Sequence, residues 1–360
     1  MGRSTAVIGT FIALWAGLVV QGQCHTPFFI FGDSLLDAGN NQYFNSGTPK
    51  SSLPYGETFF KRPSGRSCDG RIVADFLAEY ANLPLIRPYL EPGFSNYSDG
   101  ANFASAGAGI LPETNPRMIH LKMQLSYFEE VQKKLKQQEG EQKAQELLSK
   151  AVYLFSMGGN DYMNVGMPKF GDTMPPVVLT ASYKKQYVTI VLSNLTSVVK
   201  KVYAMGGRKF IFQTVGPLGC MPVSRYASGS TGCVHDVTVL AKMHNIALSK
   251  LLLKLEKTLP GFKYALFDYY SALAEITTYP SRFGFKEGRT ACCGSGNFNG
   301  QFTCGKNGTA YNLCSDPSQY VWFDAAHPTE SANKHLTSLF WSGPLKVVWP
   351  YNAKALFQMP

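Results

Sequence analysis

The sequence predicts an α/β protein with an open, mostly parallel sheet and helices on both of its faces. Two patterns lead to this prediction. Short apolar runs rich in aromatic and β-branched residues end at turn residues, and longer segments between them repeat apolar residues at helical spacing. The composition agrees, because 45% of the 360 residues are hydrophobic and only 16% are charged. Such a chain can bury a large core, and this excludes a disordered protein.

Four apolar runs are predicted to be buried parallel strands, because each is short and bounded by Gly, Pro or Asp. These runs are residues 28–31, 152–155, 210–215 and 264–267. A weaker strand candidate lies at residues 83–86 or at residues 101–103.

Helices are predicted at residues 71–80, 125–136, 183–205 and 237–258, where apolar residues recur three and four positions apart. Strands and helices therefore alternate along the chain. In open α/β sheets, ligands bind beyond the carboxyl ends of the strands. The Gly-rich segments that follow the predicted strands are thus candidate site loops.

The charge distribution argues against nucleic acid as a partner. The formal net charge is +10, but the basic residues are scattered along the chain. The densest segment, residues 122–150, also contains several Glu residues and is typical of a solvated helix. A basic balance of this kind favours association with acidic polysaccharide or anionic surfaces.

The first 23 residues are predicted to be a secretory signal peptide. Arg3 precedes an apolar run at residues 6–20, and polar residues follow it at once. Fifteen helical residues span about 22 Å, which is too short for a hydrocarbon layer of about 30 Å. A retained membrane anchor is the alternative. Residues 24–360 contain no repeat and no linker-like break, and they are predicted to form a single domain of a secreted, extracellular protein.

The cysteines agree with an oxidising compartment, where an even number of cysteines indicates disulfides. Eight are present: Cys24, Cys68, Cys220, Cys233, Cys292, Cys293, Cys304 and Cys314. Zinc is the alternative, but the spacing is unusual for zinc and the 292–314 loop contains no His. The pairing stays open, and signal cleavage after Cys24 would leave an odd number. Three sequons make Asn96, Asn194 and Asn307 candidate glycosylation sites.

Ser34 is the first candidate for chemistry, because the segment Gly32-Asp33-Ser34 directly follows the first predicted strand. It is not the nucleophile elbow Gly-x-Ser-x-Gly, since Leu36 occupies the last position. The alternative interpretation is that Ser34 caps a helix.

A serine nucleophile needs a base, which is normally a His oriented by a carboxylate. Asp324 and His327 are three residues apart and could share one face of a turn. No His-Glu-x-x-His segment supports a zinc hydrolase.

Acyl transfer also needs donors for an oxyanion. The segment 106–109 offers backbone N–H groups, including that of Gly107, and Asn160 follows two glycines after the second strong strand. The alternative for either segment is an ordinary tight turn.

The order of these motifs resembles the plant GDSL esterase/lipase family of the SGNH hydrolase superfamily. The resemblance rests on residues 31–41, 100–107, 158–161 and 324–328, and further similar segments cover nearly the whole chain after the signal. It implies a three-layer α/β/α flavodoxin-like fold with about five parallel strands.

The resemblance also implies a role for each candidate residue. Ser34 would be the nucleophile and an oxyanion donor through its N–H, and Gly107 and Asn160 would be further donors. His327 would be the base that Asp324 orients. Gly109, two residues beyond Gly107, is the alternative backbone donor. No cofactor and no metal is implied.

The function predicted from the sequence is a secreted serine esterase or lipase that hydrolyses small-molecule or lipid esters through an acyl intermediate on Ser34. The alternatives are an acyltransferase at the same site and a catalytically silent binding protein. A monomer in the apoplast or cell wall is expected, without nucleic acid and without stable membrane insertion. Tyr162, Met163 and Met167 could line an acyl pocket, although a role in the core is favoured, and the 292–314 loop is expected to border the site.

Overall fold

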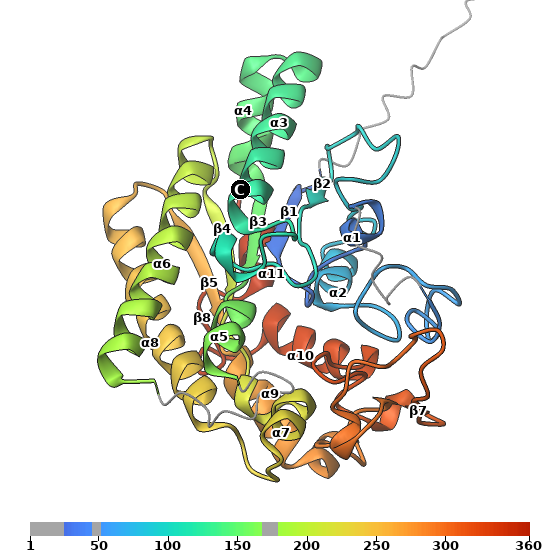
Figure 1. Ribbon diagram of the computed structural model, residues 1–360. Coiled ribbons are helices and arrows are strands. Elements are labelled where there is room, and N and C mark those ends of the chain that lie inside the picture. The colour runs from blue at the N-terminus through green and yellow to red at the C-terminus, as the bar shows by residue number, and fades with distance from the viewer. Residues whose placement is uncertain (1–24, 45–51, 168–178) are drawn as a thin grey trace, which may run out of the picture.

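The computed structural model describes residues 25–44, 52–167 and 179–360. Its centre is a six-stranded sheet (Figure 1). The strands are β1 (Phe28–Gly32), β2 (Gly100–Asn102), β3 (Val152–Ser156), β4 (Lys209–Gln213), β5 (Lys263–Phe267) and β8 (Val348–Pro350). A separate two-stranded sheet pairs β6 (Cys293–Gly294) with β7 (Asn312–Leu313).

The strand order in the large sheet is β2-β1-β3-β4-β5-β8. The first five strands are parallel, and β8 pairs antiparallel with β5 at the edge. This is the flavodoxin-like order, in which the direction of winding reverses between β1 and β3. A crevice at the carboxyl ends of these two strands is the expected ligand site. The predicted α/β fold with about five parallel strands is therefore confirmed.

The sequence did not predict β8, and one of its strand alternatives is wrong. Of the two weak candidates, the segment around residue 101 forms β2, whereas residues 83–86 form no strand. The chain beside them does approach the sheet, because Pro88 forms an isolated bridge with Asn102. Residues 83–86 include a Pro and follow a helix closely, and their burial is irregular rather than continuous.

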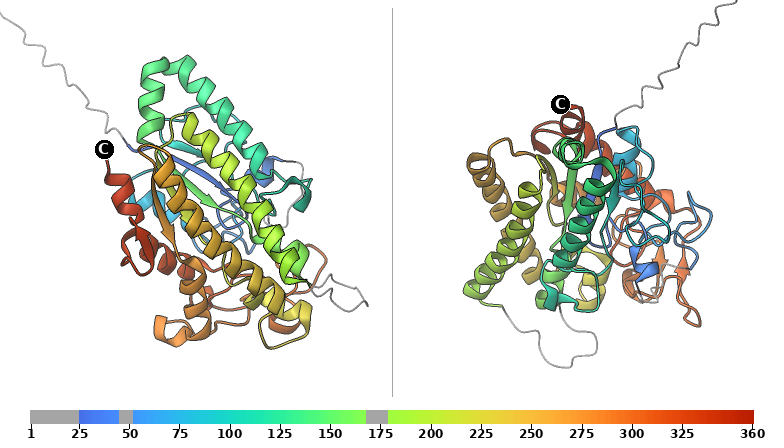
Figure 2. Two further views of the ribbon diagram at one scale, coloured as in Figure 1. Left: turned by 90° about the vertical axis from the view of Figure 1, so that its left-hand side faces the viewer. Right: turned by 90° about the horizontal axis from the view of Figure 1, so that it is seen from above.

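Helices cover both faces of the sheet and make the three layers that Figure 2 shows from two further directions. One layer contains α3 (Leu121–Glu139), α6 (Ala181–Ala204) and α8 (His235–Thr258). The opposite layer contains α2 (Val73–Tyr80), α10 (Glu330–Ser342) and α11 (Ala353–Gln358). The remaining helices are α1 (Asn40–Tyr43), α4 (Glu141–Lys150), α5 (Gly159–Gly166), α7 (Pro222–Ser228) and α9 (Tyr269–Thr278).

All four predicted helices are present, as α2, α3, α6 and α8, with ends that differ from the predictions by a few residues. Their apolar repeats face the sheet, and in α8 the buried positions Leu248, Leu252 and Leu255 show this spacing. Helix α10 was missed. It buries Leu336 and Phe340 but also Asn333 and Thr337, so polar residues interrupt the apolar pattern.

Aromatic side chains on the strands build much of the core. Phe31 on β1 stacks on Phe155 of β3 with ring centroids 4.7 Å apart, and Phe155 stacks in turn on Phe212 of β4. Parallel strands bring these residues into register, and each such ring pair contributes roughly 0.5–1.5 kcal/mol beyond its buried area. The carboxyl ends of β1 and β3 are therefore held firmly beneath the candidate site loops.

Six of the described cysteines form disulfides, as predicted. The pairs are Cys220–Cys233, Cys292–Cys314 and Cys293–Cys304. Cys68 is buried and free, and Cys24 lies outside the described residues. All four cysteines of the 292–314 loop are in disulfides, which leaves no thiolate there for a metal ion, so the zinc alternative for this loop is wrong.

No helix in residues 25–44, 52–167 or 179–360 is both long enough and apolar enough to cross a membrane. The predicted signal peptide at residues 1–23 lies outside these ranges.

Candidate active site

Three residues from opposite ends of the chain form a continuous line of hydrogen bonds. The Ser34 Oγ lies 2.8 Å from His327 Nε2, and His327 Nδ1 lies 2.6 Å from Asp324 Oδ1. Asp324 and His327 are buried, whereas Ser34 is partly exposed. In the neutral imidazole with a proton on Nδ1, that N–H donates to the carboxylate, and Nε2 accepts from the serine hydroxyl. The sequence spacing of three residues thus brings Asp324 and His327 together as expected.

The turn that carries Asp324 and His327 is held by the Asp324 carboxylate and by backbone hydrogen bonds. Asp324 Oδ1 accepts from the N–H groups of Ala326 and His327, both at 2.9 Å. The Phe323 N–H donates to the His327 carbonyl at 2.7 Å, so the loop closes on itself. The Cys293 N–H also donates to the Phe323 carbonyl at 2.7 Å. The disulfide-bonded loop therefore supports the segment that bears the imidazole.

Tyr55 completes the surroundings of the carboxylate, and sequence reasoning missed it. Its hydroxyl donates to Asp324 Oδ2 at 2.7 Å, and its ring packs against Phe323. Burial, and then the charge of Asp324, raise the pKa of Tyr55 well above its ordinary value. The hydroxyl therefore stays protonated and acts as a donor. No local pattern marks Tyr55, because it lies 269 residues from its partner.

Ser34 lies in a turn two residues after β1 ends at Gly32. The Asp33 carbonyl accepts from the N–H groups of Leu36 and Asp37. The first described helix after this turn is α1, which starts only at Asn40. The alternative that Ser34 caps a helix is therefore wrong.

A buried network of polar side chains joins the turn after β1 to the turn after β2. The Asp37 carboxylate accepts from the N–H groups of Gly39 and Asn40 at 2.7 Å and from that of Ala106 at 3.0 Å. The Asn40 amide donates to the carbonyls of Asn102 and Ala104 at 2.8 and 2.9 Å. These residues fix segment 104–107 relative to Ser34. Asp37 and Asn40 lie in the 31–41 segment on which the family resemblance rests, but no role was predicted for them.

Gly107 and Asn160 approach Ser34 from the ends of β2 and β3. Gly107 has φ of +82°, a conformation that favours glycine, whereas at Gly109 a Cβ would collide with the Thr114 side chain. In the described part of the chain, the backbone N–H groups of Ser34 and Gly107 have no hydrogen-bond acceptor. The Asn160 Nδ2 donates to the Ala108 carbonyl at 2.9 Å, which orients this amide. Gly107 and Ser34 line one cavity, and Gly109 is not part of that lining.

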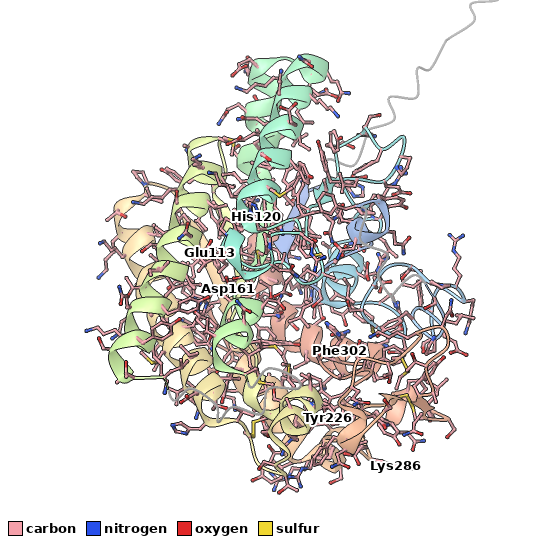
Figure 3. All side chains as sticks on the ribbon, viewed as in Figure 1. Glu113, His120, Asp161, Tyr226, Lys286 and Phe302 are labelled. Atoms are coloured by element: carbon pink, nitrogen blue, oxygen red, sulfur yellow. A yellow bond between two sulfur atoms is a disulfide. The ribbon has the colours of Figure 1, made fainter. Side chains whose placement is uncertain are left out.

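Asp161, next to Asn160, joins the same two loops, and sequence reasoning missed this role as well. Its buried carboxylate accepts from the N–H groups of Ile110 and Leu111 and from the Thr114 hydroxyl at 2.6 Å. Burial raises the pKa of Asp161, and these donors oppose that rise. Asp161 lies in the first turn of α5 and is labelled in Figure 3. The carboxylate holds the 107–114 loop against the start of α5.

A cavity of about 260 Å³ opens above Ser34. Its polar lining includes Ser34, Asn160 and His327 together with Asp33, Gly107 and Gly159, and its apolar lining consists of Leu35, Met163, Leu218, Met221, Phe302 and Ala326.

The three residues proposed from the sequence for an acyl pocket separate in the structure. Met163 lines the cavity. Tyr162 belongs to the core, where its hydroxyl lies 2.6 Å from His244 Nδ1, and Met167 packs against the core with part of its surface exposed. The 292–314 loop borders the site as expected, through Phe302 (Figure 3). A core role is therefore right for Tyr162 and Met167.

The three sequon asparagines Asn96, Asn194 and Asn307 are exposed and lie away from the cavity lining. Asn194 lies on α6, where its side-chain amide donates to the Ile190 carbonyl at 3.0 Å.

Comparison with known proteins identifies the family. The sequence model of the GDSL-like lipase/acylhydrolase family matches residues 28–340. GDSL esterase/lipase 4 of Arabidopsis thaliana is 44% identical over 345 residues, which cover 92% of this chain and 90% of that protein. The GDSL lipase of Tanacetum cinerariifolium is 44% identical over 342 residues, which cover 94% of this chain and 90% of that protein.

Inactive GDSL esterase/lipase-like protein 25 of Arabidopsis thaliana is also similar, with 35% identity over 336 residues, 92% of this chain and 75% of that protein. Membership of the family therefore does not by itself establish activity, and the geometry of the catalytic site is separate evidence. The chain belongs to the GDSL-like lipase/acylhydrolase family of carboxylic ester hydrolases, which is the family and the enzyme class that its sequence predicted.

Proposed function

We propose that this protein is a secreted serine esterase that hydrolyses carboxylic esters through an acyl intermediate on Ser34. The observation that carries the proposal is the unbroken line of hydrogen bonds from Asp324 through His327 to Ser34, which ends at the floor of a cavity. A serine hydroxyl is a weak nucleophile unless a base accepts its proton. His327 Nε2 is placed to do so at 2.8 Å.

The first step forms the acyl-enzyme. Ser34 Oγ attacks the ester carbonyl carbon while its proton moves to His327 Nε2, which leaves an imidazolium beside the Asp324 carboxylate. The carboxylate stabilises this cation and fixes the tautomer. The imidazolium then gives its proton to the alcohol oxygen as the bond between carbon and that oxygen breaks. An acyl ester on Ser34 and a free alcohol result.

Negative charge on the former carbonyl oxygen needs donors that are already in place. The backbone N–H groups of Ser34 and Gly107, which have no acceptor within the described residues, are suited to this role. Asn160 adds a side-chain donor, because one amide hydrogen is held by the Ala108 carbonyl and a second is left for the oxyanion. Loss of one donor of this kind typically lowers kcat by roughly 10²- to 10³-fold.

The second step reverses the roles. Water gives a proton to His327 Nε2 and attacks the acyl carbon, and the imidazolium returns the proton to Ser34 Oγ as the carboxylic acid leaves. An alcohol in place of water would make the same site an acyltransferase.

The apolar wall and the small volume of the cavity support the proposal that the substrate carries a small acyl group. Met163, Met221, Leu218 and Phe302 lie beside Ser34, and the volume of about 260 Å³ is below the usual range for drug-sized ligands. Esters with short acyl chains are therefore the proposed substrates, rather than long-chain lipid.

Secretion to the apoplast or cell wall is part of this proposal. The three disulfides support an oxidising compartment, and the three exposed sequon asparagines are accessible to glycosylation. A signal peptide at residues 1–23, one domain at residues 24–360 and a monomeric state remain predictions.

Hydrolysis of a p-nitrophenyl ester series from acetate to palmitate tests the proposal. The wild-type protein is compared with Ser34→Ala and with Ser126→Ala, which changes an exposed serine on α3. We expect a maximum at short chains, loss of turnover in Ser34→Ala and wild-type rates in Ser126→Ala. Retained hydrolysis in a folded Ser34→Ala protein would refute the assignment of the nucleophile.

If wild-type protein hydrolyses none of these esters, product analysis with an acyl donor and an alcohol acceptor separates an acyltransferase from a silent binding protein.

A further inference from the structure

Phe302 differs from the other apolar residues that line the catalytic cavity, because it is 41% exposed. Leu218 and Met221, in the same lining, are each only 6% exposed. A large aromatic side chain that is exposed and also lines a cavity lies at its rim, where part of the ring is free to contact a bound molecule. Phe302 is therefore available to a substrate in a way that the buried wall is not.

The loop that carries Phe302 is fixed on both sides of the ring. The Gln301 N–H donates to the Ser295 carbonyl at 3.0 Å, and the Thr303 hydroxyl donates to the Ser295 hydroxyl at 2.9 Å. The Cys293–Cys304 disulfide closes the same loop. Because the segment is already ordered, contact with a ligand costs little conformational entropy.

This loop is joined to the segment that bears the catalytic imidazole. The Gln301 side-chain amide donates to the Tyr226 hydroxyl on α7, and both Tyr226 and Phe302 are labelled in Figure 3. At the start of α7, the Val223 N–H donates to the Ala325 carbonyl at 2.8 Å, which lies within the catalytic turn. Phe302 is thus held on the side of the cavity that carries the base.

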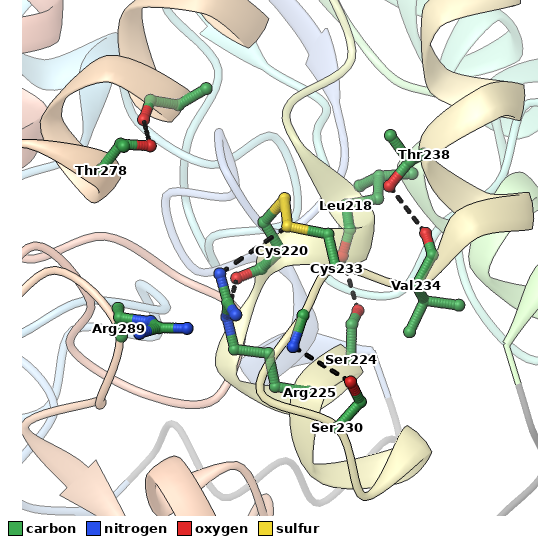
Figure 4. The surroundings of a disulfide bond; sticks show 12 residues. Leu218, Cys220, Ser224, Arg225, Ser230, Cys233, Val234, Thr238, Thr278 and Arg289 are labelled. Atoms are coloured by element: carbon green, nitrogen blue, oxygen red, sulfur yellow. Dashed lines mark hydrogen bonds between the residues drawn. A yellow bond between two sulfur atoms is a disulfide. The ribbon is translucent and has the colours of Figure 1, made fainter.

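A second apolar wall lies on the side of the oxyanion donors. Met163 follows Asn160 by three residues on α5, so the two side chains share one face of the helix. Leu218 packs over Gly159, where a Cβ would lie 3.5 Å from Leu218 Cδ2. The Cys220–Cys233 disulfide closes the turn that carries Leu218 (Figure 4). The cavity therefore has two apolar walls that different elements hold in place.

Each wall meets a different part of the ester in the mechanism proposed above. The imidazolium of His327 gives its proton to the alcohol oxygen, so the alcohol has to lie beside His327. The carbonyl oxygen points to the N–H donors, and the acyl chain takes the remaining direction, away from His327. Phe302 is then placed to contact the alcohol, and Met163 and Leu218 are placed to contact the acyl chain.

We propose that Phe302 forms the subsite for the alcohol part of the ester and selects apolar, preferably aromatic, alcohols esterified with a short acyl group. This inference rests on the serine esterase proposed above. Aromatic rings attract each other in stacked and edge-on arrangements beyond the effect of their buried area. The rim position of Phe302 leaves room for a large alcohol, whereas the buried Leu218 limits the acyl side. Phe302 determines specificity and takes no part in proton transfer.

The test compares kcat/KM for ethyl acetate, cyclohexylmethyl acetate, benzyl acetate and benzyl butyrate, with acid release followed by titration at constant pH. The alcohols have similar acidity, so differences between the acetates report contacts of the alcohol and not its strength as a leaving group. For wild type we expect benzyl acetate to be the best of the acetates, cyclohexylmethyl acetate to be intermediate and ethyl acetate to be the poorest.

Variants of the two walls should change different ratios. Phe302→Ala should lower the benzyl to ethyl ratio of kcat/KM by about 10-fold and leave the acetate to butyrate ratio of the benzyl esters unchanged. Phe302→Tyr, which keeps the ring, should retain the wild-type ratio. Met163→Ala should do the opposite of Phe302→Ala, because more space on the acyl side favours butyrate and leaves the benzyl to ethyl ratio unchanged.

Leu313→Ala is the matched control. Leu313 lies in the same 292–314 loop and is similarly exposed, but it is not part of the cavity lining. Its benzyl to ethyl ratio should be that of wild type. Circular dichroism and Tm show that each variant is folded.

The outcomes separate this inference from the proposed function. If wild type hydrolyses the esters but a folded Phe302→Ala protein keeps the wild-type benzyl to ethyl ratio, or changes the acetate to butyrate ratio instead, the alcohol subsite is wrong and the esterase stands. If wild type hydrolyses none of the four esters, or folded Ser34→Ala hydrolyses them, the proposed function fails and the subsite fails with it.

Discussion

The two halves of the catalytic site are held in place by different means. The nucleophile half, with Ser34, Gly107 and Asn160, follows three neighbouring strands and is joined by buried side chains such as Asp37. The acid–base half, with Asp324 and His327, lies in a long loop region, where backbone hydrogen bonds, disulfides and the distant Tyr55 hydroxyl support it.

This difference shows which kind of change each half tolerates. In the nucleophile half, a polar side chain such as that of Asp37 satisfies three backbone N–H groups, so its loss leaves buried donors without partners. In the acid–base half, the Asp324 carboxylate also accepts two backbone N–H groups, but an Asn at this position keeps a side-chain oxygen that accepts them. Changes of side chain there should act mainly on the chemistry.

The largest expected effect is in the acid–base half. Asp324→Asn should lower kcat by about 10⁴-fold with the fold retained, because an amide does not fix the tautomer of His327 or stabilise its cation. The measurement is kcat on p-nitrophenyl acetate together with the circular dichroism spectrum. Glu146→Gln, an exposed change on α4, should keep the wild-type rate. A near-wild-type rate in Asp324→Asn would mean that another group orients His327.

The next effect is in the nucleophile half. Asn160→Ala should lower kcat by roughly 10²- to 10³-fold with little change in KM, because the oxyanion forms only after the substrate is bound. Asn164→Ala is the matched control, since Asn164 is exposed one turn later on α5. Equal kcat values for the two variants would remove Asn160 from the oxyanion hole.

Tyr55→Phe should produce a smaller loss of kcat, and it tests the side-chain support of the acid–base half. The variant removes one donor to a buried carboxylate, and we expect kcat to fall about 10-fold with KM unchanged. Tyr311→Phe changes a partly buried residue that packs against the same small cluster, and it should have no such effect.

The ratio of wild-type kcat to Tyr55→Phe kcat, measured as a function of pH, tests the role of Tyr55 itself. Since burial and Asp324 raise the pKa of Tyr55, its hydroxyl remains a donor over the working range. The ratio of wild-type to variant kcat should thus be constant from about pH 6 to 9. A ratio that falls toward one within that range would show that the hydroxyl ionises and does not support the carboxylate as proposed.

The smallest expected effect is on the free energy of unfolding and its dependence on pH. It concerns His244, which lies next to Gly158, the residue before α5. Burial lowers the pKa of His244 to about 3, whereas an unfolded His has a pKa of about 6.5. The unfolded chain therefore takes up a proton first as pH falls. His244 should contribute a loss in the free energy of unfolding of about 1.4 kcal/mol per pH unit below about pH 6.5.

Guanidinium unfolding between pH 7 and 5 measures this contribution. His244→Gln should be less stable at pH 7 but lose less stability on acidification, while His235→Gln, an exposed change on α8, should match the wild-type slope. An unchanged acid slope in His244→Gln would show that His244 is not the group that titrates.

Much of this architecture could be predicted from the sequence, because local patterns encode it. Runs such as residues 28–31 and 152–155 are apolar enough to be recognised as buried strands, and their order along the chain suits a parallel sheet. Asp324 and His327 could be paired because they are three residues apart. The cavity residue Phe302 was anticipated only as part of the 292–314 loop.

The features that were missed depend on contacts between distant segments. Tyr55 meets Asp324 only because two loops fold together, and nothing in its neighbourhood marks this partner. Strand β8 is three residues long and contains a Pro, so its sequence does not resemble a strand. The same limit applies to the disulfide pairing, which the number of cysteines alone leaves open.

The most direct test of the central claim is to label the wild-type protein with a fluorophosphonate and to map the modified peptide by mass spectrometry. Ser34 should carry a single adduct, and the Ser34→Ala variant should stay unlabelled although it is folded. An adduct on a different serine, or equal labelling of Ser34→Ala, would contradict a mechanism in which His327 activates Ser34.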